Sequence, residues 1–453
     1  MHSMSELLRR FLKNHRLNLI LGLLLALPCL IYLMNARWEG TGWRYSIHSD
    51  GKGYYAYLPA LFIYGDSEFR FVRDYEQKYY DPGNYVNFTS KVNDITVNKY
   101  WSGTALMMLP FFCVADFLAH LLDYPDDGYS FPYQASVGIA AVFWLLFGCL
   151  CLLQLLTRYF LIHPFISIAS ILLFVFSSNL FYYTVAEPSM SHVYSFAILS
   201  GFLYFLSQYI RLNSISALWA SGIFAGMLLL IRPTNVLLLL SFLILFKNFK
   251  DFRSFFKVLF SSLFFPLTAL LLCGLVLFVQ FYYFHRISGK WWIDSYVNEN
   301  FNFLQPELFN FLLSYRKGLW IYTPIAFFAL LGLLPLFKKS SFVGLAVSTA
   351  IFIYYYVLSS WWMWFYGGSF GMRAAIDAFP LLIILLAHFI QFLSPKIRIP
   401  FALLLLACFT LNLIQTYQYT HWILPWDNMN KEKYWKIFLQ TSNDYIGVAT
   451  PDN

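Results

Sequence analysis

The chain has 453 residues, of which 59% are hydrophobic and only 12% are charged. Soluble domains usually carry about 25% charged residues, so this composition excludes an ordinary water-soluble protein. The net charge of +8 does not indicate nucleic acid as a partner, because the basic residues lie in short loops between apolar blocks.

These apolar blocks have the length of membrane-spanning helices. We predict an all-α, polytopic membrane bundle with about eleven spans, each near the ~20 residues that cross a bilayer. The predicted spans are 17–36, 133–156, 164–184, 191–210, 215–231, 234–246, 258–284, 318–337, 341–358, 374–393 and 398–416. Trp38-Glu39-Gly40 follows the first block without a small-residue cleavage site, so we expect that block to be retained.

Basic residues mark alternate loops, and such loops face the cytoplasm. They are Arg9, Arg10, Lys13, Arg16, Arg158, Arg211, Lys247, Lys250, Arg253, Lys257, Lys338, Lys339, Lys396 and Arg398. The N-terminus is therefore predicted to be cytoplasmic, and residues 1–416 to form one multi-spanning domain. The extracytoplasmic side would hold loops 37–132, 185–190, 285–317 and 359–373 and a short C-terminal tail, 417–453.

The segment 100–122 is also apolar enough to span. If it crossed the bilayer, the basic loop 247–257 would lie outside, against the charge rule. Pro110 and Asp116 also interrupt the segment. We predict an interfacial or re-entrant helix within the first outer loop, with crossing as the alternative.

The first outer loop opens with an aromatic stretch that carries one acid. Asp50 lies shortly after the first helix and is followed by Lys52, Tyr54 and Tyr55. A carboxylate at the lipid boundary is partly desolvated, which raises its basicity. Asp50 is therefore a candidate base, and the alternative is a turn residue that caps the next helix.

Other ionisable residues open predicted helices on the same side. Lys99 begins the segment 100–122, where it could contact a lipid phosphate or simply extend to the interface. Glu187 and His192 bracket the start of the span 191–210. Ionisable residues at membrane depth are functional candidates, although an acid at a helix start also balances the helix dipole.

Two arginines complete the set of candidates. Arg232 lies in a tight turn between apolar helices, and its guanidinium needs a phosphate, a carboxylate or the headgroup layer as partner. The glycine-rich segment 361–373 ends at Arg373, which could pair with Asp377 four residues later. The tryptophans of this segment, among them Trp364, form either an interfacial belt or a platform for a sugar ring.

In chain order, this pattern resembles that of the GT-C fold glycosyltransferases, which take sugars from polyprenyl-phosphate donors. The residues that carry the resemblance are Asp50, Lys99, Glu187, Arg232 and Arg373. It covers most of residues 1–393 and is closest to the bacterial branch related to protein mannosyltransferases and lipid A aminoarabinose transferases. This chain differs from many members in having a single acid in the first loop, and Asn98-Lys99-Tyr100-Trp101 replaces the usual lysine–proline–proline element.

The resemblance implies an inverting sugar transfer to an acceptor hydroxyl, with Asp50 as the base. Lys99, Arg232 and Arg373 would bind the donor phosphate, and Glu187 would orient the acceptor or share a divalent ion with Asp50. Lys52, Tyr54, Tyr55, His192 and Trp364 would bind substrate. No His and Cys residues have the spacing of metal ligands, so we predict neither an obligatory metal nor another cofactor.

Two other functions remain open. A transporter or flippase for lipid-linked saccharides would line a route across the bilayer with polar residues, whereas the ionisable residues here collect at one face. A non-catalytic assembly protein would not bring the candidate residues into one pocket. The sequence does not indicate whether the acceptor is a lipid, a glycan or a protein. The resemblance places the chain in a bacterial inner (cytoplasmic) membrane, with an extracytoplasmic C-terminus.

Overall fold

The computed structural model describes residues 4–80, 88–297 and 299–449, and side chains from Arg16 onward. The side chains of Arg9, Arg10 and Lys13, on which the predicted orientation partly depends, lie outside this description. So do residues 81–87 of the first loop and residues 450–453 of the predicted tail.

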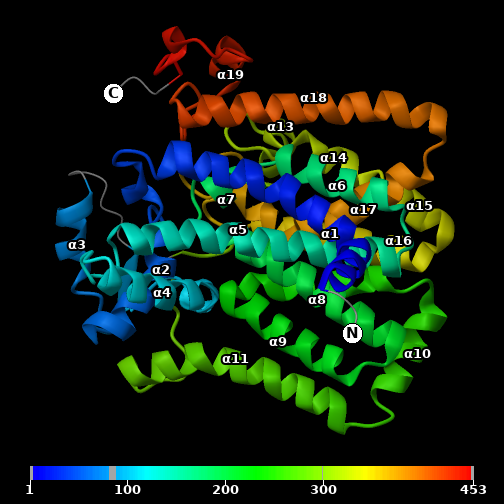
Figure 1. The fold of residues 1–453 in the computed structure, drawn as a ribbon, viewed down its shortest axis with the longest axis horizontal. Coiled ribbons are helices and arrows are strands. Elements are labelled where there is room, and N and C mark those ends of the chain that lie inside the picture. The colour runs from blue at the N-terminus through cyan, green and yellow to red at the C-terminus, as the bar shows by residue number, and fades with distance from the viewer. Residues whose placement is uncertain (1–3, 81–87, 298, 450–453) are drawn as a thin grey trace.

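The described chain is mostly helical (Figure 1). Its α-helices are α1 (Met4–Tyr32), α2 (Gly51–Pro59), α3 (Val72–Tyr79), α4 (Gly103–Leu121), α5 (Phe131–Gln154), α6 (Pro164–Phe176), α7 (Leu180–Val185), α8 (His192–Leu212), α9 (Ile215–Ile231), α10 (Phe249–Leu259), α11 (Phe264–Ser288), α12 (Leu308–Leu313), α13 (Leu319–Tyr322), α14 (Pro324–Leu330), α15 (Leu333–Lys339), α16 (Ser341–Ser359), α17 (Phe379–Phe392), α18 (Pro395–Thr420) and α19 (Lys431–Ile437). The π-helical turns are η1 (Leu33–Arg37), η3 (Ala60–Tyr64) and η4 (Leu155–Tyr159), and the 3-10 helices are η2 (Gly42–Tyr45), η5 (Pro233–Leu245), η6 (Arg373–Ala378) and η7 (Asn443–Tyr445).

Within the described residues, 8 helical segments are long and apolar enough to cross a membrane. They are Arg16–Arg37, Gly103–Leu121, Phe131–Tyr159, His192–Leu212, Phe264–Ser288, Ser341–Ser359, Arg373–Phe392 and Pro395–Thr420, and α6, α9 and η5 are shorter apolar helices. These helices confirm a polytopic helical membrane protein. The number of crossings stays a prediction.

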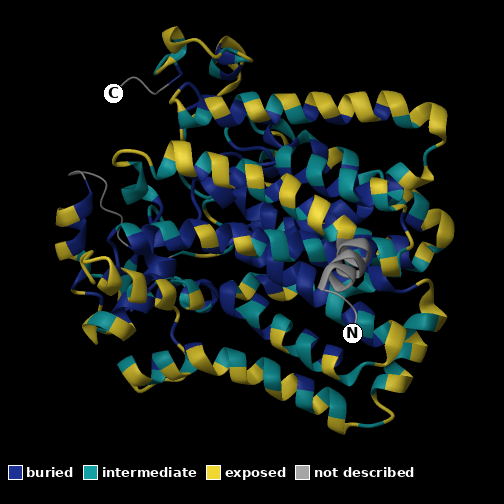
Figure 2. Ribbon diagram, viewed as in Figure 1, coloured by how far each residue is buried: buried dark blue, intermediate teal, exposed yellow. Residues whose placement is uncertain are grey.

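Burial separates the central helices from the peripheral ones (Figure 2). The most apolar stretch of α8 is 78% buried inside the protein, whereas that of α11 is 11% buried. On α11, Leu267, Leu270 and Leu271 are exposed. Such a continuous apolar surface is unfavourable in water but suits contact with lipid chains. The peripheral helices therefore form the lipid-facing layer around a core that contains α8 and α17.

The predicted span 318–337 is not a single helix. The structure divides it into α13, α14 and α15. Pro324 has no backbone N–H to continue α13, so it begins a new helix instead. At Gly332 the backbone passes so close to α17 that an added Cβ would lie 2.0 Å from the Leu385 carbonyl oxygen. This contact seats the interrupted segment against the core.

The helix α4 lies within the loop 37–132 and runs beside the first part of α5. Trp144 Nε1 donates to the Met107 carbonyl at 3.0 Å, and Tyr133 donates its hydroxyl to Asp116 at 2.6 Å. The end of α4 therefore lies at the start of α5, next to α2 and α3 (Figure 1). We call this end of the bundle the loop-rich end. Because Gly103–Leu121 is also long and apolar enough to cross a membrane, the choice between an interfacial or re-entrant helix and a crossing one stays a prediction.

A β-hairpin that the all-helical prediction did not include precedes α4. It pairs β1 (Thr89–Val92) with β2 (Ile95–Asn98) in antiparallel register, with Thr89 opposite Asn98. Asn93 and Asp94 form its turn and both have positive φ, as a two-residue hairpin turn requires. Asn98 Nδ2 donates to the Gly53 carbonyl at 2.7 Å, which fixes the hairpin, and Lys99 after it, against α2.

Candidate functional site

The centre of the candidate site is an ion pair between the first loop and the start of η6. Asp50 directly precedes α2, but its side chain does not cap that helix. Instead, Asp50 Oδ2 accepts a hydrogen bond from Arg373 Nη2 at 2.6 Å. The Asp50 side chain is 23% exposed and that of Arg373 is 9% exposed. Two predicted site residues are therefore in direct contact at the loop-rich end.

The surroundings of Asp50 keep its carboxylate ionised. Burial alone raises the pKa of Asp50, because a charge is less stable away from water. The charge of Arg373, hydrogen bonds from Tyr100 and Arg373, and the charge of Arg232 together outweigh burial, and the pKa of Asp50 is lowered. Asp50 is therefore an anion at neutral pH whose basicity depends on its two arginine neighbours.

A second cluster adjoins this pair at the ends of α9 and α8. Arg232 Nη2 donates to the Tyr54 hydroxyl at 3.4 Å, and its Nη1 lies 3.8 Å from Asp377 Oδ2. Asp377 is fully buried, and its Oδ1 lies 3.1 Å from His192 Nδ1. Among the described residues, His192 Nε2 has no hydrogen-bond partner. Asp377 thus links a predicted phosphate-binding residue to a predicted substrate-binding one.

The alternative that Arg373 pairs with Asp377 along one helix is not what the structure shows. Residues 373–378 form the 3-10 helix η6. With three residues per turn, side chains four positions apart point about 120° apart, so they do not face each other. Arg373 therefore pairs with Asp50, and Asp377 with Arg232 and His192.

The glycine-rich loop before η6 sets the position of Arg373. Gly371 has φ +60°, and an added Cβ there would lie 2.9 Å from Tyr322 Cβ, so only glycine fits without strain. The neighbouring Phe370 is held at both backbone groups. Its carbonyl accepts from Asn179 Nδ2 at 2.9 Å, and its N–H donates to the Tyr183 hydroxyl at 3.0 Å. The loop is therefore fixed directly before Arg373.

Aromatic rings from three segments surround the Asp50 and Arg232 clusters. The rings of Tyr54 and Tyr100 lie 4.5 Å apart, and Tyr100 contacts Tyr296 edge-on at 6.1 Å. Tyr296 in turn contacts Trp361 at 5.8 Å. Tyr100 and Tyr296 were not among the predicted site residues. Their position joins the first loop, the loop 285–317 and the tryptophan segment into one wall.

Lys99 and Glu187 flank this centre and have partners of their own. Lys99 Nζ lies 3.1 Å from Glu299 Oε1, so its charge is balanced within the protein. Glu187 is 5% exposed, and its Oε1 accepts from the Tyr182 hydroxyl at 2.9 Å. Among the described residues, Glu187 Oε2 has no hydrogen-bond partner. Phosphate binding by Lys99 and acceptor binding by Glu187 stay predictions.

The remaining predicted substrate-binding residues serve packing in this structure. Lys52 is fully buried, pairs with Glu76 at 2.7 Å and lies 4.0 Å from the Tyr80 ring centre. The Tyr55 hydroxyl donates to the Gly128 carbonyl at 2.7 Å. The Trp364 ring packs edge-on against Phe365 at 5.7 Å. These contacts hold the first loop and the tryptophan segment in place, and a substrate contact by any of the three residues stays a prediction.

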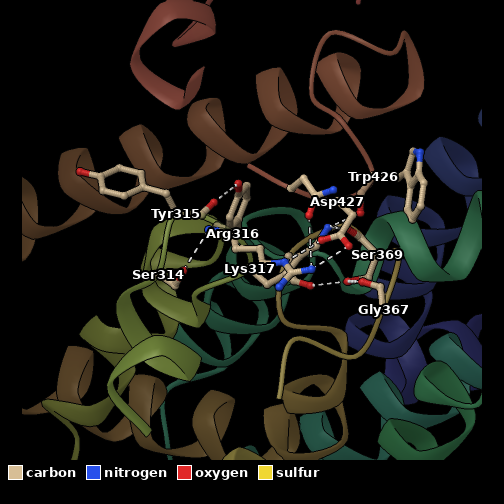
Figure 3. A network of polar contacts seen from close by, with 11 residues as sticks. Ser314, Tyr315, Arg316, Lys317, Gly367, Ser369, Trp426 and Asp427 are labelled. Carbon is tan, nitrogen blue, oxygen red and sulfur yellow. Dashed lines mark hydrogen bonds and ion pairs between the residues drawn. The ribbon is translucent and has the colours of Figure 1, made fainter. Parts of the chain in front are cut away.

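A polar network that was not predicted ties the C-terminal segment to the glycine-rich loop (Figure 3). Arg316 donates to both carboxylate oxygens of Asp427, at 2.8 and 2.9 Å. Lys317 Nζ donates to the Trp426 carbonyl at 2.6 Å and also to the Ser369 carbonyl. Burial lowers the pKa of Lys317 to about 7. Ser369, which this network holds, lies four residues before Arg373. The C-terminal segment therefore supports the loop that positions Arg373.

The described residues contain no group of three or more His, Cys, Asp or Glu side chains placed to hold a metal ion. What the site offers is the ionised carboxylate of Asp50 beside the guanidinium groups of Arg373 and Arg232, with the buried Asp377 carboxyl group 3.8 Å from Arg232. Such a set can bind an anion, because guanidinium groups match the geometry of phosphate, and can accept a proton next to it. No protein-family model matches the chain, and no curated protein is significantly similar to it.

Proposed function

We propose that the chain is a membrane glycosyltransferase that moves a sugar from a polyprenyl-phosphate donor to an acceptor hydroxyl. The observation that carries the proposal is the convergence of Asp50, Arg373 and Arg232 at one end of an apolar helical bundle. A lipid-linked donor is a substrate that an enzyme of this kind reaches from the bilayer. The resemblance to the GT-C fold, by residue pattern, supports the same class.

In this mechanism the two arginines recognise the donor phosphate. Arg373 contacts Asp50 directly, and Arg232 lies near enough for its charge to lower the pKa of Asp50. Planar guanidinium groups donate paired hydrogen bonds to phosphate oxygens. When Arg373 turns part of its hydrogen bonding toward the phosphate, Asp50 loses its strongest stabilising partner. The pKa of Asp50 then rises toward its ordinary value, so donor binding makes the carboxylate a better base.

The chemical step follows from these positions. The acceptor hydroxyl oxygen forms a bond to the anomeric carbon while the bond from that carbon to the phosphate oxygen breaks, with inversion. Asp50 takes the hydroxyl proton, and the phosphate leaves with the electron pair of the broken bond. Arg232 and Arg373 stabilise the negative charge that develops on the leaving group.

The distribution of charge favours an enzyme over a transporter. Two adjoining clusters of ionisable residues, Asp50 with Arg373 and Arg232 with Asp377 and His192, gather at the loop-rich end. A carrier that alternates between two sides needs polar groups along its route. We propose that the loop-rich end is extracytoplasmic and that the membrane is a bacterial inner membrane, with the lipid, glycan or protein acceptor approaching from outside the lipid core.

The test is sugar transfer in reconstituted liposomes that contain radiolabelled polyprenyl-phosphate sugars. We expect Asp50→Asn to lower the transfer rate about 10²- to 10⁴-fold, the usual contribution of a general base. Asp94→Asn is the matched control, because Asp94 is an exposed turn residue of the hairpin and Asn tolerates its positive φ. Wild-type activity in Asp50→Asn would refute the mechanism. Donor that changes leaflet without being consumed would support a flippase instead.

A further inference from the structure

A second feature lies at the opposite end of the bundle, where α10 and α15 are found (Figure 1). A cavity of about 750 Å³ opens there between the ends of η4, α8, η5, α10 and α15. Its volume is within the range of roughly 300–1,000 Å³ that small-ligand sites occupy. It shares no residue with the site around Asp50, so it calls for an explanation of its own.

The cavity combines a basic rim with an apolar wall. Four basic side chains line it, and Asp251 is its only acidic lining residue among the described residues. The basic residues are Arg158, Arg211, Lys247 and Lys339. The ion pairs formed within the described part of the chain lie elsewhere, so none of these four charges is balanced by a carboxylate partner. Phe160, Phe255 and Leu336 contribute to the apolar wall.

The neighbouring helix α10 indicates that the cavity opens at the level of lipid headgroups. Lys250, Arg253 and Lys257 follow one another at helical spacing on α10, and phenylalanines occupy several of the positions between them. No residue of α10 is buried in the protein, and Phe249 is 52% exposed. A helix with exposed aromatic residues on one face and basic residues on the other lies in the membrane interface.

We propose that this cavity binds an anionic phospholipid, with the headgroup phosphate at the four basic side chains and the acyl chains against the apolar wall. A lipid explains both halves of the lining, whereas a free phosphate would explain only the basic rim. The interfacial position of α10 brings such lipids to the opening. Basic pockets between membrane helices bind anionic headgroups through the same combination of charge and apolar contact. The proposal is independent of the function assigned to the loop-rich end.

The test titrates lipid onto the full-length protein in detergent and follows bound lipid by native mass spectrometry. Lys247→Gln/Lys339→Gln removes two exposed lining charges, which leaves the fold undisturbed. We expect this variant to bind phosphatidylglycerol about 30-fold more weakly than the wild type. Each basic residue near the surface contributes about 1 kcal/mol to the binding of anionic lipid, and about 1.4 kcal/mol corresponds to a tenfold change in affinity. Ser254→Trp, which places a bulky side chain in the cavity lining without changing the charge, should weaken binding as well.

The matched control is Arg253→Gln/Lys257→Gln, which removes the same charge from the same end of the protein but outside the cavity lining. This control should keep the wild-type affinity for phosphatidylglycerol. Equal losses in both double variants would overturn the proposal in favour of diffuse surface attraction. Equal binding of phosphatidylglycerol and phosphatidylcholine, or displacement of the lipid by millimolar inorganic phosphate, would also overturn it.

Discussion

Arg373 Nη2 lies 2.6 Å from Asp50 Oδ2, although 323 positions separate the two residues in the chain. The contact joins the start of the first loop to the helix that follows the glycine-rich loop. It therefore ties two distant segments together at the loop-rich end of the bundle and keeps the Asp50 carboxylate ionised. Because the pair is mostly buried, its two charges depend on each other for stability.

The first prediction concerns that dependence. We expect Arg373→Met to lower the free energy of unfolding by about 2–3 kcal/mol, because it leaves the Asp50 charge without a partner. Asp50→Asn should cost less, since an amide oxygen still accepts from Arg373. The double variant should be more stable than the sum of the two losses implies, by at least about 1 kcal/mol. Unfolding of the purified variants in mixed detergent micelles measures this coupling, and strictly additive losses would contradict it.

A second prediction compares two glycines of the same loop. Gly371 and Gly367 both have positive φ, but their surroundings differ. An added Cβ at Gly371 would lie 2.9 Å from Tyr322 Cβ, whereas an added Cβ at Gly367 would lie 3.7 Å from Met363 Sδ, an ordinary contact distance. Alanine at either position costs about 1–2 kcal/mol through its backbone conformation. Gly371→Ala should cost more, because Tyr322 must also move.

The two glycine variants also separate stability from function. Under the proposed mechanism, Gly371→Ala displaces Arg373. It should therefore slow sugar transfer by more than the loss of stability, measured as the fall in melting temperature, accounts for. Gly367→Ala, which lies farther from Arg373 in the loop, is the control for backbone strain. Equal melting temperatures and equal transfer rates in the two variants would show that the Tyr322 contact does not position the loop.

The sequence was sufficient for the helical architecture but not for the partners within the site. The length of the apolar blocks predicts helices, because a bilayer fixes how many residues a crossing needs. The hairpin around Asn93 and Asp94 was missed, since its strands are four residues each and lie in a loop with no repeating pattern. Its Asn-Asp turn between β-branched residues was the one available signal.

The contact partners of the site residues were not predicted, for a different reason. Lys52, Asp50 and Arg373 were all recognised as candidates, but their contacts depend on segments far apart in the chain. The sequence offered Arg373 a local partner in Asp377, and the 3-10 geometry of η6 removes that option. For Lys52, predicted to bind substrate, the sequence did not indicate the ion pair with Glu76 that the structure shows. Such choices follow from the packing of whole segments, which local spacing does not encode.

A third prediction concerns the attachment of the C-terminal segment. Asp427→Asn removes the negative charge and one of the two oxygens that accept from Arg316, and so weakens a paired contact that contributes about 1–3 kcal/mol. The segment after α18 should then open more often, and added protease should cut reconstituted protein there faster than in the wild type. Asp444→Asn, at an exposed position of η7, is the control. Unchanged cleavage in Asp427→Asn would show that the other contacts of the segment suffice.

The last prediction is a pH dependence at Lys317, which joins the same segment to Ser369. Burial lowers the pKa of Lys317 from 10.5 to about 7 in the folded protein. Between these values the unfolded chain binds one proton more than the folded one, so stability should rise with pH across this window and be lowest below pH 7. The melting temperature of the wild type should therefore increase from pH 7 to 9 relative to Lys317→Met, by an amount that corresponds to at most about 1.4 kcal/mol per pH unit. Lys436→Met, an exposed lysine of α19, should keep the wild-type slope. If the melting temperatures of the wild type and Lys317→Met changed with pH in parallel, the pKa of Lys317 would not be lowered in the folded protein.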